Sequence, residues 1–153
     1  YRADASFDVV FDETAATLAV RGYFELNDSK MTINSIEKLA LLAGFLDPFI
    51  EAYWCTVDSL AELESFPLWD KELLNRGLEL ARRRYLEGKI SRPEAANQTV
   101  VKAALNWLQG EGWLKSATID KKKNLQLTEF ATADERSKFS TKLSAFLVTP
   151  STD

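Results

Sequence analysis

Apolar residues recur at spacings of three and four along most of this chain, which is the period of one face of an α-helix. The pattern predicts helices over about residues 7–21, 36–64, 68–87 and 132–147, and a further helix that follows Ser91-Arg92-Pro93-Glu94 and ends at Gly110-Glu111-Gly112. Asp47-Pro48 is expected to kink the second helix or to restart it, because proline lacks the amide donor and clashes one turn back. Ser91 and Glu94 match a capping box for the fourth helix.

Two pairs of short apolar runs interrupt the helices. One pair flanks Asn27-Asp28-Ser29 and the other flanks a lysine-rich turn at 120–123, so each predicts a β-hairpin. Each hairpin follows a helix that ends at a Gly-aromatic pair, Gly22-Tyr23 or Gly112-Trp113. This order of helix and hairpin is that of winged-helix modules, although convergent packing of two unrelated units would give the same pattern.

The fold class is therefore mainly α, with five to six helices, one or two small β-hairpins and a winged-helix-like order of elements. The length of 153 residues suits one ordinary domain and is marginal for two. We expect a single accessory domain over residues 1–148 and a disordered tail over residues 149–153.

Composition restricts the chemistry more than the fold does. The chain contains no histidine, which excludes Ser-His-Asp and Cys-His catalysis and every histidine-containing zinc site within it. The single cysteine, Cys55, has no basic neighbour in the sequence to activate it. We therefore expect no catalytic, cofactor-binding or metal-binding residue in this chain, and no cofactor.

Charge disfavours nucleic acid as a partner. The net charge is −4, from 19 basic and 23 acidic residues, whereas phosphate contacts normally require a basic excess. Arg82, Arg83 and Arg84 form the sharpest basic cluster and are candidate phosphate contacts. Successive helical residues point about 100° apart, however, so a solvated face is the competing interpretation.

An aromatic stripe on the second helix is the candidate contact with another domain. It contains Phe49, Tyr53 and Trp54, for which core packing is the competing interpretation. The polar face of the same helix is acidic, which disfavours contact with anionic lipid headgroups, and Asp58 and Glu62 are expected on an exposed face. Its carboxylates are Glu51, Asp58, Glu62 and Glu64.

Two segments resemble a known family. Residues 39–60, LALLAGFLDPFIEAYWCTVDSL, are similar to a helical segment of bacterial-type glycerol-3-phosphate acyltransferases, and residues 78–114 are similar to the segment that follows it. The turn at 87–94, EGKISRPE, matches that family's turn closely. The resemblance covers about two-thirds of the chain and rests on architectural motifs. The order of elements also agrees with the region after the catalytic domain in glycerol-3-phosphate and dihydroxyacetone-phosphate acyltransferases.

The resemblance implies a role without catalysis. Members of the family transfer an acyl group to the sn-1 hydroxyl of glycerol 3-phosphate through a His-x4-Asp motif, which this chain lacks. The family's FPEG-type motif is also missing, since Phe66-Pro67 is followed by Leu68-Trp69. None of the family's catalytic residues can therefore be placed here.

The resemblance implies a C-terminal accessory domain, inactive alone, of an acyltransferase in phospholipid biosynthesis. Its implied partner is the catalytic domain of the same polypeptide. Through the parent protein it would lie on the cytoplasmic face of a membrane, with no nucleic acid bound. The alternative is a free-standing winged-helix module that binds a protein or nucleic acid. Substitution of Lys121, Lys122 and Lys123, followed by measurement of DNA affinity against salt, would test it. The acceptor, glycerol 3-phosphate or dihydroxyacetone phosphate, and the acyl donor stay open.

Overall fold

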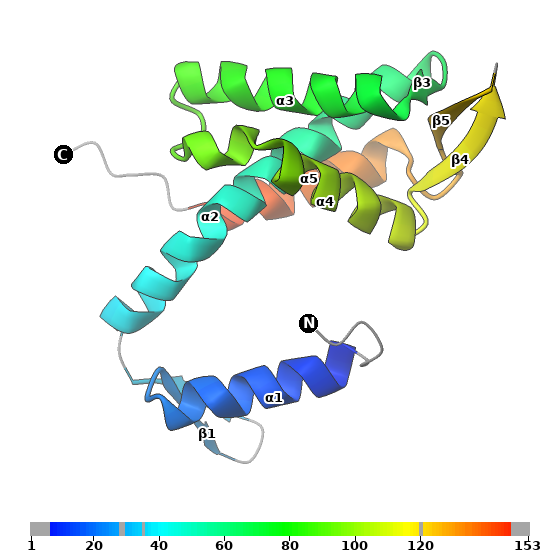
Figure 1. Ribbon diagram of the computed structural model, residues 1–153. Coiled ribbons are helices and arrows are strands. Elements are labelled where there is room, and N and C mark those ends of the chain that lie inside the picture. The colour runs from blue at the N-terminus through cyan, green and yellow to red at the C-terminus, as the bar shows by residue number, and fades with distance from the viewer. Residues whose placement is uncertain (1–6, 28–29, 35, 120, 148–153) are drawn as a thin grey trace. The chain divides into compact units, whose positions relative to one another are not determined.

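The computed structural model describes residues 7–27, 30–34, 36–119 and 121–147 (Figure 1). The chain divides into two compact units, residues 1–45 and residues 46–153. The single accessory domain over 1–148 stays a prediction, and the tail expected over 149–153 lies outside the described residues.

The first unit consists of a helix and a hairpin, followed by the beginning of α2. The helix is α1 (Phe7–Val20), and the hairpin pairs β1 (Phe24–Asn27) with β2 (Lys30–Ile33). The strands are antiparallel, with Phe24 opposite Ile33. Gly22 lies between α1 and β1 with φ of 73°, a left-handed conformation that side chains disfavour and that commonly ends helices.

The second unit contains most of the helices and a three-stranded sheet. The strand order is β3-β5-β4, and both pairings are antiparallel. From the C-terminal part of α2 onward, the sequence helix, strand, helix, helix, hairpin is the winged-helix order, and α5 is added at the end (Figure 1). The elements are α2 (Ile36–Ser59), η1 (Leu60–Glu64), β3 (Leu68–Trp69), α3 (Asp70–Leu86), η2 (Pro93–Ala96), α4 (Gln98–Gly110), β4 (Leu114–Ile119), β5 (Lys122–Leu127) and α5 (Ala133–Phe146).

These elements confirm the predicted fold class, which is mainly α with two small antiparallel sheets. The repeated helix–hairpin pattern is also present in the backbone hydrogen bonds. The amide of Tyr23 donates to the carbonyl of Leu18 at 3.1 Å, and the amide of Trp113 donates to the carbonyl of Leu108 at 2.9 Å. A second hydrogen bond closes each hairpin. The Asn34 amide donates to the Tyr23 carbonyl at 3.3 Å, and the Thr128 amide donates to the Trp113 carbonyl at 3.1 Å.

The core of the second unit lies where α2, α3, α4 and the sheet meet. Gly77 allows this close approach, because a Cβ on Gly77 would lie 2.9 Å from the Val101 Cγ1 atom. Burial of these side chains supplies the main driving force for folding. The core residues include Ala52, Val57, Leu60, Leu73, Leu78, Ala81, Val101, Leu105, Leu108, Leu114 and Leu125.

Two local predictions are wrong. The helix does not restart at Pro48, because α2 continues from Ile36 to Ser59 with Pro48 inside it. Ser91 does not cap α4, because α4 begins only at Gln98, where the Asn97 side chain accepts the Thr99 amide at 2.8 Å. The hydrophobic face of α2 outweighs the loss of one backbone hydrogen bond at proline.

Candidate functional site

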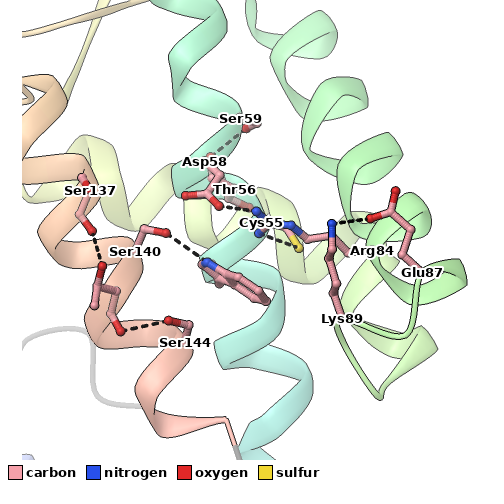
Figure 2. A network of polar contacts seen from close by, with 12 residues as sticks. Cys55, Thr56, Asp58, Ser59, Arg84, Glu87, Lys89, Ser137, Ser140 and Ser144 are labelled. Atoms are coloured by element: carbon pink, nitrogen blue, oxygen red, sulfur yellow. Dashed lines mark hydrogen bonds and ion pairs between the residues drawn. The ribbon is translucent and has the colours of Figure 1, made fainter. Parts of the chain in front are cut away.

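Arg84 connects α3 to α2 through several contacts with one helical turn (Figure 2). Its guanidinium lies 4.0 Å from the centroid of the Trp54 ring, within the range of a cation–π interaction. One nitrogen donates to the Asp58 carboxylate in an ion pair, and the other lies 3.8 Å from the Cys55 sulfur. The indole N–H of Trp54 donates to the Ser140 hydroxyl on α5 at 3.0 Å. The group therefore joins three helices.

Cys55 is fully buried within this group. Burial raises the pKa of its thiol to about 11, because desolvation disfavours the thiolate, and the nearby Arg84 charge only partly opposes this. At neutral pH the thiol is protonated, and it is a poor nucleophile. The sequence prediction that Cys55 is inert agrees with this environment, although the sequence did not reveal Arg84 as its neighbour.

A second group of aromatic rings packs α2 against α4 and α5. Tyr53 and Trp107 have ring centroids 5.6 Å apart, Trp107 and Phe139 lie 5.5 Å apart in a stacked arrangement, and Phe139 lies 5.4 Å from Trp113. Such pairs add stabilisation beyond the area they bury. Tyr53 is therefore part of the interior packing of the second unit.

The three candidate contact residues of α2 thus lie in different surroundings. Tyr53 and Trp54 are partly buried and packed against the core. Phe49 is 50% exposed, and Leu46, three residues earlier on the same helix, is 51% exposed. The contact with another domain stays a prediction, and Phe49 is the member of the set that has surface available for it.

The three arginines also diverge, as expected from their helical spacing. Arg82 and Arg83 are exposed, whereas Arg84 is directed into the second unit by Trp54 and Asp58. Arg83 lines a shallow cleft together with Glu62, Arg76 and Glu79. The structure therefore does not bring the three guanidinium groups to one point, and the phosphate contact stays a prediction for the exposed pair.

Glu51 is the residue that sequence reasoning missed. Its side chain is buried, with the whole residue only 2% exposed, and its carboxylate receives three hydrogen bonds from the turn that precedes η2. The Ser91 amide donates to Oε1 at 2.6 Å, the Ser91 hydroxyl donates to Oε1 at 3.0 Å, and the Arg92 amide donates to Oε2 at 2.9 Å. Arg92 also pairs with Asp47 at 3.8 Å. Glu51 therefore fixes the EGKISRPE turn on α2.

The expectation of an exposed face is therefore wrong for Asp58, and two other carboxylates of α2 and η1 are also engaged. Glu51 is buried, Asp58 pairs with Arg84, and Glu64 pairs with Arg136 of α5. Arg136 is itself buried and donates to the Ala131 carbonyl at 2.7 Å. The signal that could have indicated this is the number of arginines in the later helices, although sequence spacing does not say which acid each one meets.

Within the described part of the chain, no group of three acidic or cysteine residues is placed to hold a metal ion.

The segment Ile36–Glu64 is long and apolar enough to cross a membrane by length and composition alone. The core helix of a globular domain has the same properties, and Ala52, Val57 and Leu60 of this segment are core residues. The part of this segment that contains these three residues therefore packs against the core of the second unit.

Comparison with known protein families gives a match over most of the chain. The family model of the glycerol-3-phosphate acyltransferase C-terminal region matches residues 1–117, which include the Glu51 contact and Arg84 with its partners on α2. The match ends within β4, so β5 and α5 lie beyond it. A sequence search of curated proteins found no match. The resemblance seen in the EGKISRPE turn is confirmed, and the chain belongs to the family of the glycerol-3-phosphate acyltransferase C-terminal region.

Proposed function

We propose that this chain is a non-catalytic accessory region of a membrane-associated glycerol-3-phosphate 1-O-acyltransferase, and that it supports or regulates the catalytic domain of the same polypeptide. The observation that carries the proposal is the family match over residues 1–117. The absence of histidine supports it, because the general base would then be supplied by another part of the protein.

Phe49 is the centre of the proposed contact with the catalytic domain. Phe49 and Leu46 present exposed apolar surface one turn apart on α2. The next turns of the helix are held by the Glu51, Tyr53 and Trp54 contacts. A rigid helix that presents aromatic surface loses little conformational entropy on binding, which favours this edge over a loop.

The test is a titration between two separately produced pieces: this chain and the remainder of the acyltransferase that contains it. Isothermal calorimetry should detect binding between them. Phe49→Ser should weaken that binding by at least tenfold, because truncating a central aromatic contact commonly costs more than 1.4 kcal/mol (about tenfold in affinity). Absence of any binding would refute the proposed docking on the catalytic domain.

Phe130 provides a matched control. It is also a phenylalanine, it is 70% exposed, and it lies beyond the matched residues. Phe130→Ser should leave the affinity within about twofold of the unsubstituted chain, since an exposed residue outside the interface contributes little. Equal losses in the two variants would show that α2 is not the contact.

Membrane association is proposed to come from the parent protein, with this region on the cytoplasmic face. The net charge of −4 argues against direct attraction of the chain to anionic lipid. In a flotation assay with vesicles, the whole acyltransferase should float and the chain alone should stay at the bottom of the gradient.

The winged-helix order favours one alternative, a module that binds a protein or nucleic acid. Lys121 lies in the turn between β4 and β5, and Lys122 and Lys123 are on β5. Strong DNA binding that falls with salt and disappears when the three lysines are replaced by glutamine would displace the accessory role.

A further inference from the structure

A cleft of about 190 Å³ lies between the beginning of α3, one face of α4 and strand β5. Its floor is apolar and includes the buried side chains of Leu74, Leu105 and Leu125. Three lysines from three different elements line it: Lys71 of α3, Lys102 of α4 and Lys123 of β5. None of these residues belongs to the candidate contacts on α2.

The lining carries excess positive charge. Among the described residues that line the cleft, Asp70 is the only acidic one, so three lysines and one aspartate give these residues a formal charge of +2, in a chain whose net charge is −4. One Asp70 oxygen already accepts the Lys71 amide at 2.7 Å. Among the ion pairs seen between described residues, none involves Lys71, Lys102 or Lys123. Such charge favours an anionic ligand.

The beginnings of two helices are a second source of positive charge at the cleft. The Lys71 ammonium lies 5.1 Å from the centroid of the Trp69 ring and the Lys122 ammonium lies 5.0 Å from the same centroid, so both lysines also make cation–π contacts with Trp69. Asp70 and Gln98, the first residues of α3 and α4, both line the cleft. The beginnings of two long helices therefore add their partial positive charges to those of the lysines.

The face of α4 that lines the cleft supplies neutral polar groups. Gln98, Lys102, Asn106 and Gln109 recur at spacings of four, four and three, so they form one stripe along the helix. The Gln109 amide donates to the Ser116 hydroxyl on β4 at 2.9 Å, which holds that side chain in place. Amide groups beside lysines are suited to the several oxygens of a phosphoryl group.

We propose that this cleft binds a phosphomonoester group, carried either by a small soluble molecule or by a lipid headgroup. At about 190 Å³ the cleft is smaller than the pockets that hold drug-sized molecules, so it suits a group as small as a phosphate. A nucleic acid fits the site less well, because DNA binders make many phosphate contacts and α4 has Lys102 as its one basic residue. The proposal is independent of the role of Phe49.

The test follows the backbone amides of the ¹⁵N-labelled 153-residue chain by NMR while inorganic phosphate is added at constant ionic strength. The expected result is saturable shifts that are concentrated at Lys71, Lys102 and Lys123. Each lysine substitution should weaken binding about threefold, as for a partly solvated ion pair, so K102Q combined with K123Q should weaken it about tenfold.

Lys142→Gln is the matched control, because Lys142 is an exposed lysine on α5 that does not line the cleft. It should leave the affinity unchanged, and all variants should keep the melting temperature of the original chain. Unsaturable shifts spread over many lysines, or equal binding by the double variant and the control, would overturn the proposal.

A second arm separates the two ligand sources. Vesicles of phosphatidylcholine are compared with vesicles that also contain phosphatidic acid, whose headgroup is a phosphomonoester. Binding to the second kind that requires Lys102 and Lys123 would assign the cleft to a lipid headgroup, and phosphate binding without vesicle binding would assign it to a soluble ligand. Salt-dependent binding of duplex DNA through the same lysines, tighter than phosphate, would refute both.

Discussion

Replacing Glu51 by glutamine tests whether the buried carboxylate holds the family's characteristic turn in place. The two carboxylate oxygens receive the amides of Ser91 and Arg92 and the Ser91 hydroxyl. Glutamine has nearly the same shape but only one accepting oxygen. In either orientation of the new amide, its N–H₂ group faces the backbone N–H of Ser91 or of Arg92. Two donors then face each other, and neither has an acceptor.

The magnitude follows from those contacts. A hydrogen bond to a charged group contributes about 1.5–3 kcal/mol, and a buried donor left without a partner costs about 1–3 kcal/mol. Because Glu51 is only 2% exposed, water cannot easily replace the lost acceptor. We expect Glu51→Gln to lower the free energy of unfolding by about 2–3 kcal/mol, which corresponds to about 5–10 °C in Tm for a chain of this size.

The assay is urea denaturation followed by circular dichroism, with thermal melting as a second measurement. Glu62→Gln is the matched control, since Glu62 is an exposed glutamate on η1, and it should change stability by less than about 0.5 kcal/mol. If Glu51→Gln is as stable as Glu62→Gln, the three hydrogen bonds do not hold the turn and the reasoning is refuted.

Four further predictions concern the second unit. Gly77→Ala should destabilise the protein by about 1–2 kcal/mol in urea, because overpacking outweighs the better helix propensity of alanine, whereas Gly110→Ala, with open space around it, should be neutral or stabilising. Cys55 should react with a thiol reagent at pH 8 only as fast as the protein unfolds. Its folded-state pKa is raised from 9.0 to about 11, so stability should be full below pH 9 and fall as the pH rises toward 11, a slope that Cys55→Ala should lack. Arg84→Met and Asp58→Asn should show a coupling energy above about 1 kcal/mol in a double-mutant cycle, and additive effects would contradict the ion pair.

Much of the fold was predictable from local pattern. The helices over 7–21 and 68–87 were expected and appear as α1 (Phe7–Val20) and α3 (Asp70–Leu86), because helical periodicity is visible within a few turns. Both hairpins were likewise predicted, since each combines two short strands with a polar turn. The start of α4 was misplaced because two capping patterns lie close together, and only packing shows that Ser91 is engaged by Glu51.

The candidate site was less predictable. Phe49, Tyr53 and Trp54 were identified as one stripe, but their exposure differs because α4 and α5 cover only part of α2. The lysine-lined cleft was not anticipated, since Lys71, Lys102 and Lys123 are far apart in sequence and line one cleft only when α3, α4 and β5 pack together.

The sequence by itself determined most of the helices and both hairpins in their order, the absence of histidine chemistry and the resemblance that the family match confirms. These properties depend on residue identity and on patterns within about twenty positions. The tertiary structure decided which charged groups are buried and which partners they have: Asp58 meets Arg84, Glu51 meets Ser91, and Glu64 meets Arg136, at separations of 26, 40 and 72 residues. Helical periodicity shows which face of a helix a carboxylate occupies, but the element that covers that face depends on long-range packing.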